Sequence, residues 1–379
     1  MAGKIDILLF VEDSSAANYA ALLLPELIRQ GWVVQLYAST VACGWLHSRG
    51  VAFSECAVDT DALTLLSETN PRCVLVGTAA NPDTLGLHLI DAARIARIPS
   101  VAFIDALMGA GNRFRGVVGC DDALAHAPDW LFVPDRMTCD AFVGLGYPQQ
   151  RITVCGHPLY DETRALAKRW EETGGPASSR RRLFPDVTSG RRILTFVSEP
   201  DPRYGRLPPY SSNEYGFTGR GVHKERTKII LEEVLDAISV LAERPYVVFR
   251  AHPIDIIDEY AEYKPEIDFF SSGGLPLELV YATDLTVGRT SMLLLEAALL
   301  GRPSLAVLVH VKDIDLLPNV RNGVTPYVLN RQDLRKILPD LLSKDWTLAR
   351  SEGDMLVSDA AVRVTQALSN IIQHRYVSP

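Results

Sequence analysis

The sequence predicts an α/β protein built from two doubly wound domains of mainly parallel strands. Short apolar runs alternate with helical patterns along the whole chain, and polar residues follow directly after several of the runs. The chain has 379 residues, whereas single hydrophobic cores rarely grow beyond roughly 250–300 residues. We therefore expect two domains.

The composition is that of an ordinary globular protein, with 47% hydrophobic and 22% charged residues. The formal net charge of −8 argues against a general nucleic-acid binder, which is usually basic. The six cysteines show no Cys-x-x-Cys pair and no histidine at metal-ligand spacing, so we expect reduced thiols and no metal site. The short apolar run before Glu12 predicts a strand, not a signal peptide. No apolar stretch approaches the roughly 20 residues of a transmembrane segment, and we expect a cytoplasmic protein.

The first domain begins with a buried strand and continues in a regular strand–helix rhythm. Its first helical pattern starts after Asp13 and Ser14, either of which suits an N-cap, and ends at Gly31. Strands are expected at residues 5–11, 33–37, near 53, and at 73–77, 100–104, 130–134 and 152–155. Helices are expected at residues 16–30, 40–48, 60–68, 84–96 and 136–145.

Residues 164–192 differ in character from both flanking regions. A charged helical stretch leads into Gly-Gly-Pro-Ala-Ser-Ser and three arginines, a composition that predicts a linker. We place the first domain, with the start of the linker, at 1–175 and the second domain at 176–379.

The second domain repeats the rhythm of the first. Its loop 198–223 is long, and its aromatic residues argue against simple disorder, so a functional loop is expected. Strands are expected at residues 193–197, 246–250, 268–270, 284–287 and 304–309. Helices are expected at residues 224–243, 276–281, 292–300, 331–342 and, as a long C-terminal helix, 354–374.

The stretch 283–303 carries the strongest signal for a binding site. A strand ends in Gly288-Arg289-Thr290-Ser291, and a helix begins at once. Such a turn offers unpaired backbone N–H groups and the positive end of the helix dipole, which together attract anions. Glu296, further along the helix, is placed to accept hydrogen bonds from a sugar hydroxyl. An ordinary strand–helix unit with a polar cap explains the same pattern about as well.

Other polar residues fall at neighbouring strand ends of the second domain. Ser198 and Glu199 follow one strand, and Arg250, His252 and Pro253 end or follow the next. Ligands of doubly wound sheets bind beyond the carboxyl ends of the strands, so these residues and 288–291 predict a phosphate and ribose pocket. Arg250 suits bidentate phosphate binding, although strand alternation can point it away from the pocket.

Three acids of the first domain are candidates for acid–base chemistry. Glu12 and Asp13 follow the first strand, and Asp105 follows the strand at 100–104. A carboxylate there suits a general base, although Asp13 suits a helix cap equally well. The sequence contains no Walker motif, His-Glu-x-x-His zinc motif or Gly-x-Ser-x-Gly elbow.

The whole pattern resembles the GT-B glycosyltransferase superfamily, which has two Rossmann-like domains facing across a cleft and a C-terminal helix. The run DLTVGRTSMLLLEAALLGRP resembles its donor-site segment, which implies that Thr290 and Ser291 lie at the phosphates and Glu296 near the ribose. The segment Arg250-Ala251-His252-Pro253 is similar to the His-Pro motif of transferases that use cytidine nucleotides. UDP-GlcNAc 2-epimerases share the fold but carry a Ser-Gly-Gly turn where this chain has Gly-Arg-Thr-Ser.

The resemblance implies a metal-independent glycosyltransferase of bacterial surface-glycan biosynthesis, with no resident cofactor. Its donor would be a CMP- or UDP-linked sugar, with a CMP-nonulosonic acid suggested by the His-Pro motif and Arg289, and its acceptor a glycan or a protein. Asp13, or else Glu12 or Asp105, would deprotonate the acceptor, and His252 with the 290–291 hydroxyls would stabilise the leaving phosphate. Two alternatives stay open: a UDP-sugar 2-epimerase or hydrolase on the same fold, and a non-catalytic nucleotide-sugar binding module.

Overall fold

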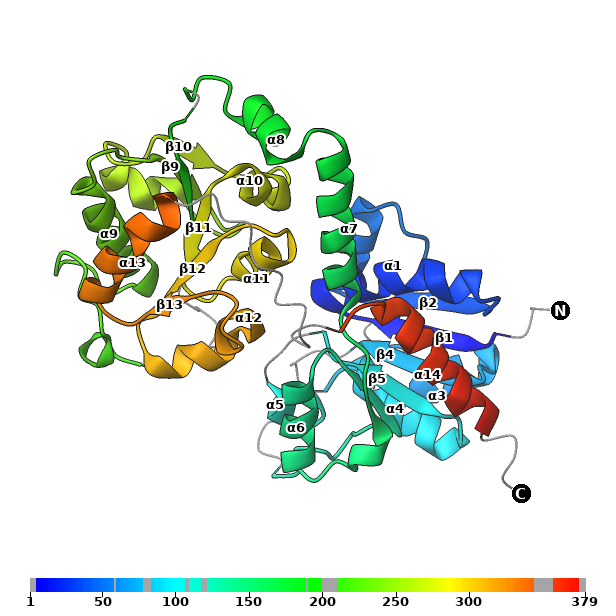
Figure 1. Ribbon diagram of the computed structural model, residues 1–379. Helices are drawn as coiled ribbons and strands as arrows, with labels where there is room; N and C mark the ends of the chain where they lie inside the picture. The colour runs from blue at the N-terminus through cyan, green and yellow to red at the C-terminus, as the bar shows by residue number, and fades with distance from the viewer. Residues whose placement is uncertain are drawn as a thin grey trace. The chain divides into compact units, whose positions relative to one another are not determined.

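The computed structural model describes residues 5–57, 59–77, 83–105, 109–116, 121–188, 190–199, 210–343 and 357–374. The chain forms two compact units (Figure 1). Unit 1 consists of residues 1–162 together with 356–379, and unit 2 of residues 163–355. Both are parallel α/β sheets covered by helices, as the sequence predicts.

Unit 1 contains a seven-stranded sheet in the order β3-β2-β1-β4-β5-β6-β7, in which all pairs are parallel. The strand order reverses between β1 and β4, the first and fourth strands along the chain. The strands are β1 (Ile7–Val11), β2 (Val34–Ala38), β3 (Ser54–Glu55), β4 (Cys73–Gly77), β5 (Ser100–Phe103), β6 (Trp130–Val133) and β7 (Ile152–Val154).

Helices cover both faces of this sheet. One core lies under α1, α2 and the C-terminal helix α14, and the other lies under α3, α4 and α6. The central strand β1 is fully buried, which explains its unbroken apolar run. The helices are α1 (Ser14–Arg29), α2 (Val41–Ser48), α3 (Ala62–Thr69), α4 (Leu85–Ala96), α5 (Ala110–Arg113), α6 (Arg136–Gly144), η1 (Gln149–Arg151) and α14 (Ala360–His374), with α7 (Pro158–Glu172) leading into unit 2.

Unit 2 contains a six-stranded parallel sheet in the order β10-β9-β8-β11-β12-β13. Its order reverses between β8 and β11, again the first and fourth strands of the unit. Helices α9 and α13 cover one core, and α10, α11 and α12 pack in smaller clusters. The strands are β8 (Ile193–Val197), β9 (Tyr246–Arg250), β10 (Phe269–Ser271), β11 (Leu285–Gly288), β12 (Ser304–Val307) and β13 (Tyr327–Val328). The helices are α8 (Gly175–Leu183), η2 (Ser212–Glu214), α9 (Arg226–Ser239), η3 (Ile257–Tyr263), α10 (Pro276–Ala282), α11 (Met292–Leu299), η4 (Val311–Leu316), α12 (Pro318–Arg321) and α13 (Arg331–Ser343).

The segment expected to be a linker is largely helical. Helix α8 contains the three arginines, and Arg180 donates a hydrogen bond to Asp284 at 2.8 Å. Asp284 also accepts from the backbone N–H of Ile193 at 2.7 Å, so one carboxylate joins α8 to the base of β8 and β11. Tertiary contacts therefore overcome a composition rich in Gly, Pro and Ser.

The C-terminal helix packs on unit 1 and not on the second domain to which the sequence division assigned it. Val364, Leu368 and Ile372 are buried in the same core as Leu9 and Leu23. The second domain expected at 176–379 therefore differs from unit 2, residues 163–355, in both its first and its last residue.

The second half of the long loop 198–223 is anchored on α9. Glu233 accepts hydrogen bonds from the backbone N–H groups of Thr218 and Gly219 and from the guanidinium of Arg331. Glu232 accepts from the backbone N–H of Arg220 at 2.6 Å. These buried carboxylates hold residues 218–220 of the loop against α9, whereas residues 200–209 lie outside the described part of the chain.

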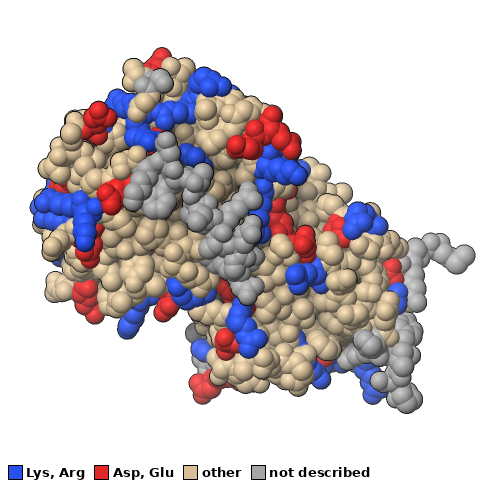
Figure 2. All heavy atoms as spheres, viewed as in Figure 1, with Lys and Arg blue, Asp and Glu red and all other residues tan. Residues whose placement is uncertain are grey.

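Basic and acidic side chains are interspersed on the face shown in Figure 2. Within the described residues no helix is long and apolar enough to cross a membrane.

Candidate functional site

The reversal of strand order in unit 2 brings its polar strand ends together. All strands of the sheet are parallel, so the residues that follow β8, β9 and β11 lie at one edge (Figure 1). Neighbouring strands that lead their helices to opposite faces leave a crevice between them at this point. Candidate residues follow both of the strands that flank it, β8 and β11.

Glu199 crosses this crevice and binds the turn after β11. Its carboxylate accepts the backbone N–H of Thr290 at 2.8 Å and the Thr290 hydroxyl at 2.6 Å. Arg289, only 3% exposed, lies 3.2 Å from the same carboxylate. The Glu199 backbone carbonyl accepts from the hydroxyl of Thr227 near the start of α9. The turn predicted to bind anions thus holds an anion of the chain itself.

The strand-to-helix junction itself is tightly packed. A Cβ on Gly288 would lie 2.4 Å from Cγ2 of Val197, so only glycine fits at the end of β11. Ser291 is the N-cap of α11, and its hydroxyl accepts the N–H of Leu293 at 3.3 Å. Further along α11, burial raises the pKa of Glu296 to about 7.

Arg250 and Ser198 lie at the same edge but have partners in the protein. Arg250 donates to the Ser271 hydroxyl at 3.0 Å and to the carbonyl of Gly273, and its burial lowers its pKa. It therefore ties β9 to the loop after β10. The hydroxyl of Ser198 lies 3.4 Å from that of Tyr260 in a buried contact.

His252 and Pro253 are exposed in the turn after β9. The backbone N–H of His252 donates to Asp255 at 2.8 Å, and its Nδ1 accepts from the N–H of Ile254 at 3.3 Å. Because Nδ1 accepts, the neutral ring carries its proton on Nε2. His252 is thus a fixed donor that solvent reaches.

The crevice of unit 1 is built in the same way from β1 and α4. Glu12 directly follows β1, is only 8% exposed, and accepts hydrogen bonds from the Thr84 hydroxyl and the backbone N–H of Gly86. Burial raises its pKa to about 7, and the neighbouring charge of Asp13 adds to the shift. Asp13 is the N-cap of α1 and accepts the N–H of Ala16 at 2.7 Å. Of the two adjacent acids, Asp13 caps a helix and Glu12 reaches into the crevice.

Asp105 is buried in an ion pair. Arg113 donates to it at 3.1 Å, and the Ser15 hydroxyl is a second hydrogen-bond partner. Burial raises the pKa of Asp105, and the Arg113 charge opposes that rise. His157 accepts the N–H of Leu159 and donates to the backbone carbonyl of Asp105, and burial lowers its pKa to about 4. This group holds β5, α1 and the start of α7 together.

Sequence reasoning named Arg289 and Thr290, which bind Glu199, but missed the residues that bind Glu12. Thr84 was expected only as a helix start, Gly86 carried no sequence signal, and the pairing of Asp105 with Arg113 was not predicted. One sequence signal is common to Glu12 and Glu199. Each follows a Phe-Val pair at the end of a strand, in Phe10-Val11-Glu12 and in Phe196-Val197-Ser198-Glu199. Thr78 and Asn81, polar residues that follow the strand expected at 73–77, lie outside the described residues.

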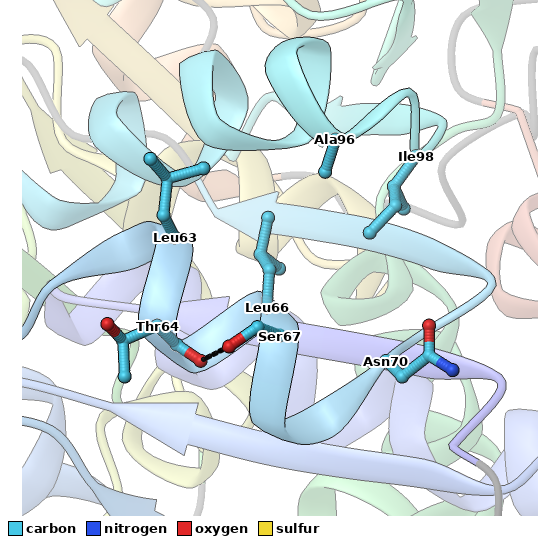
Figure 3. A pocket seen from close by; sticks show the side chains of 7 residues that line it. All are labelled: Leu63, Thr64, Leu66, Ser67, Asn70, Ala96 and Ile98. Atoms are coloured by element: carbon cyan, nitrogen blue, oxygen red, sulfur yellow. Dashed lines mark hydrogen bonds between the residues drawn. The ribbon is translucent and has the colours of Figure 1, made fainter.

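A surface hollow of about 480 Å³ lies apart from both crevices, between α3 and α4. Figure 3 shows the side chains of Leu63, Leu66, Ala96 and Ile98 around it, with the Ser67 hydroxyl donating to the Thr64 carbonyl at 2.8 Å. None of the candidate residues lines it. The described residues also contain no group of three His, Cys, Asp or Glu side chains able to hold a metal ion.

Comparison with known proteins finds a likeness of fold only. No protein-family model and no curated protein matches the chain. The UDP-GlcNAc 2-epimerase of Neisseria meningitidis, bound to UDP-GlcNAc, has a TM-score of 0.68 at 13% identity, over 97% of this chain and 100% of its own. The chain has a GT-B-like fold. The Methanocaldococcus jannaschii UDP-GlcNAc 2-epimerase, in complex with UDP-GlcNAc and UDP, has a TM-score of 0.60 at 14% identity, over 96% and 99%.

A third GT-B neighbour is the wall teichoic acid polymerase TagF, with a TM-score of 0.53 at 13% identity, over 99% of this chain and 90% of its own. At these identities the neighbours show the fold alone. They overturn the leading functional prediction, since 2-epimerases and complexes with UDP support the alternative better than a glycosyltransferase with a CMP-linked donor. The turn at 288–291 did not predict the function correctly because a small-residue turn before a helix can bind any phosphate. It indicates neither the base of the nucleotide nor the reaction.

Proposed function

We propose that this chain is a UDP-sugar enzyme of the 2-epimerase or hydrolase kind, which binds the nucleotide at the β8–β11 crevice of unit 2. The observation that carries the proposal is the binding of the Glu199 carboxylate by the turn after β11. A backbone N–H, a hydroxyl and a guanidinium converge on it. A phosphate oxygen requires the same donors.

In this proposal a phosphate group of the ligand replaces the Glu199 carboxylate at Thr290 and Arg289. His252, with Nε2 as a donor in solvent at the same sheet edge, is the second phosphate contact. The Glu296 carboxyl group makes no hydrogen bond or ion pair with any described residue, which leaves it for a ribose hydroxyl. Ser291 caps α11 and Arg250 braces β9, so both support the site without touching the ligand.

Epimerisation at C2 of a sugar breaks and re-forms the C2–H bond, so it needs a group that both takes and gives a proton near neutral pH. A side chain whose pKa lies near the working pH does both efficiently. Glu12, with its pKa raised to about 7, is the candidate in unit 1. Asp13 and Asp105 are less suited, because one caps a helix and the other is held in a buried ion pair.

The test is incubation with UDP-GlcNAc in deuterated water, with no acceptor present. We expect release of UDP and deuterium at C2 of the sugar, both read by NMR, and expect Glu12→Gln to abolish the exchange while leaving UDP binding intact. UDP bound without exchange or release would favour the non-catalytic binding module. Transfer only after an acceptor is added would also contradict the proposal. The cytoplasmic location stays a prediction.

A further inference from the structure

A cavity of about 560 Å³ lies in unit 1 between the C-terminal helix and the end of the sheet. Its wall on the sheet side comes from β6 and from β7, which is the edge strand. Trp130 and Arg151 stand at the amino ends of these strands. The candidate acids follow the carboxyl ends, so the cavity belongs to a different part of the sheet.

The other wall is one face of α14. Arg363, Gln366 and Asn370 recur at helical spacing and line the cavity. The opposite stripe, which includes Val364 and Leu368, is buried in the core. The helix is thus amphipathic, and its polar face closes over the cavity without filling it.

The arginine side chains that line the cavity have hydrogen-bond donors that no described residue accepts. Arg363 donates through Nε to the carbonyl of Ser358 at 2.9 Å, and its two terminal amino groups have no partner among the described residues. Arg151 is exposed, and its guanidinium makes no hydrogen bond or ion pair with any described residue. The one lining carboxylate, Asp129, already accepts the N–H of Ser100 at 3.0 Å and its hydroxyl at 3.2 Å.

We propose that this cavity binds a small anionic molecule that carries a phosphate or carboxylate group on a flat apolar body. Arg151 and Arg363 come from opposite walls and match an anion, since guanidinium groups bind such groups through paired hydrogen bonds. Trp130, Val154 and Ile371 supply an apolar surface beside them. The volume lies within the roughly 300–1,000 Å³ typical of small-molecule sites.

The experiment titrates the full-length protein with phenyl phosphate, which carries both proposed features, and measures heat of binding. We expect saturable binding that weakens roughly tenfold or more in Arg363→Gln and in Arg151→Gln, since each removes a charged hydrogen-bond donor. Inorganic phosphate should bind more weakly than phenyl phosphate because it lacks the apolar body. The control is Arg136→Gln, which removes an exposed arginine paired with Asp140 and outside the cavity.

Two results would overturn the assignment. The first is no heat of binding with phenyl phosphate up to about 10 mM, which corresponds to a binding free energy weaker than roughly 3 kcal/mol. The second is binding that Arg363→Gln and Arg151→Gln leave unchanged. Circular dichroism of each variant establishes that it is folded. The test needs no UDP-sugar, so its outcome does not depend on the proposed activity. Binding lost equally in Arg136→Gln would point to general charge and would also contradict the proposal.

Discussion

The crevices of the two units have the same arrangement of a glutamate after their first strand, but they differ in the charge beside that glutamate. In unit 1 Glu12 reaches from the end of β1 to the start of α4, and in unit 2 Glu199 reaches from the end of β8 to the start of α11. In both, an acid satisfies backbone N–H groups that a helix start leaves unpaired. Among the described residues, Glu199 has the Arg289 guanidinium beside it, whereas the charge that acts on Glu12 is that of Asp13.

The two crevices are suited to different chemistry because their charges differ. A carboxyl group buried without a cation is stabilised in its neutral form, which makes Glu12 a carrier of a proton near neutral pH. A carboxylate held by a guanidinium and a helix start marks a place where negative charge is stabilised. One crevice is therefore suited to proton transfer and the other to phosphate binding.

The largest expected effects on stability come from substituting Gly77 and Gly288, the glycines that end β4 and β11. A Cβ on Gly77 would lie 2.6 Å from Cβ of Ala16 and 2.8 Å from the Phe103 ring, whereas a Cβ on Gly288 would come within 3 Å of one methyl group, Cγ2 of Val197. We expect Gly77→Ala to lower the free energy of unfolding by about 3 kcal/mol and Gly288→Ala by about 1–2 kcal/mol, measured by urea unfolding. The control Gly44→Ala has nothing within 4 Å in α2 and should stabilise by roughly 0.5–1 kcal/mol. Equal losses at both strand ends would contradict the packing argument.

The raised pKa of Glu12 predicts a pH dependence of stability. Between the ordinary pKa of 4.5 and the folded value of about 7, the folded state holds more protons than the unfolded state. The free energy of unfolding therefore falls as the pH rises through this window and levels off above it. Relative to Glu12→Gln, the wild type should lose roughly 2–3 kcal/mol between pH 4.5 and pH 7.

Urea unfolding of both proteins across this window gives the difference directly. A constant difference would mean that the crevice does not favour the neutral form of Glu12. Asp61→Asn serves as a control of opposite sign, because hydrogen bonds with Thr64 lower the pKa of this exposed N-cap acid, so its contribution to stability is lost as the pH falls.

The contacts of Glu199 predict that its removal lowers the free energy of unfolding and that bound UDP restores part of this loss. Glu199→Ala should lower the free energy of unfolding by about 1–2 kcal/mol, since Arg289 and Thr290 lose the carboxylate that they bind. Saturating UDP should shrink this deficit because phosphate takes the same donors. Thermal melting with and without UDP measures both values, and a deficit that UDP leaves unchanged would show that phosphate binds elsewhere. Glu12→Ala should show no such repair.

The threonine hydroxyls give the smallest expected effects. Thr290→Val removes one donor to Glu199, and Thr84→Val removes one donor to Glu12, so each should cost about 1 kcal/mol of stability. Only Thr290→Val should also weaken UDP binding, by roughly three- to tenfold. Calorimetric titration of both variants with UDP tests this, and equal weakening would remove the division of roles between the crevices.

Apolar periodicity was sufficient to predict both sheets. Buried strands such as β1 and β8 are continuous apolar runs, and Gly31 follows the end of the first helix as expected. The same pattern was insufficient for α8 and α14. A helical stripe shows that a helix has an apolar face but not which sheet it covers, and the Arg180–Asp284 contact joins residues 104 positions apart.

The candidate site was predicted as a set of strand ends but not as a set of contacts. Topology alone brings Glu199 and Thr290 to one edge, because both follow strands of one parallel sheet. Their hydrogen bonds span 91 positions and depend on the order of the strands, which the sequence does not state. Arg250 was a correct strand-end residue whose partners, Ser271 and Gly273, only the fold reveals.

The packing of α14 on unit 1 also determines the order in which the two units can be completed during synthesis. Unit 2 is one continuous segment, so all of its residues are synthesised before α14. The residues of unit 1 that contact Val364, Leu368 and Ile372 must wait with an apolar face uncovered while roughly half of the chain is added. The unit that begins first is thus finished last, and its open face is where we expect a chaperone to bind the nascent chain.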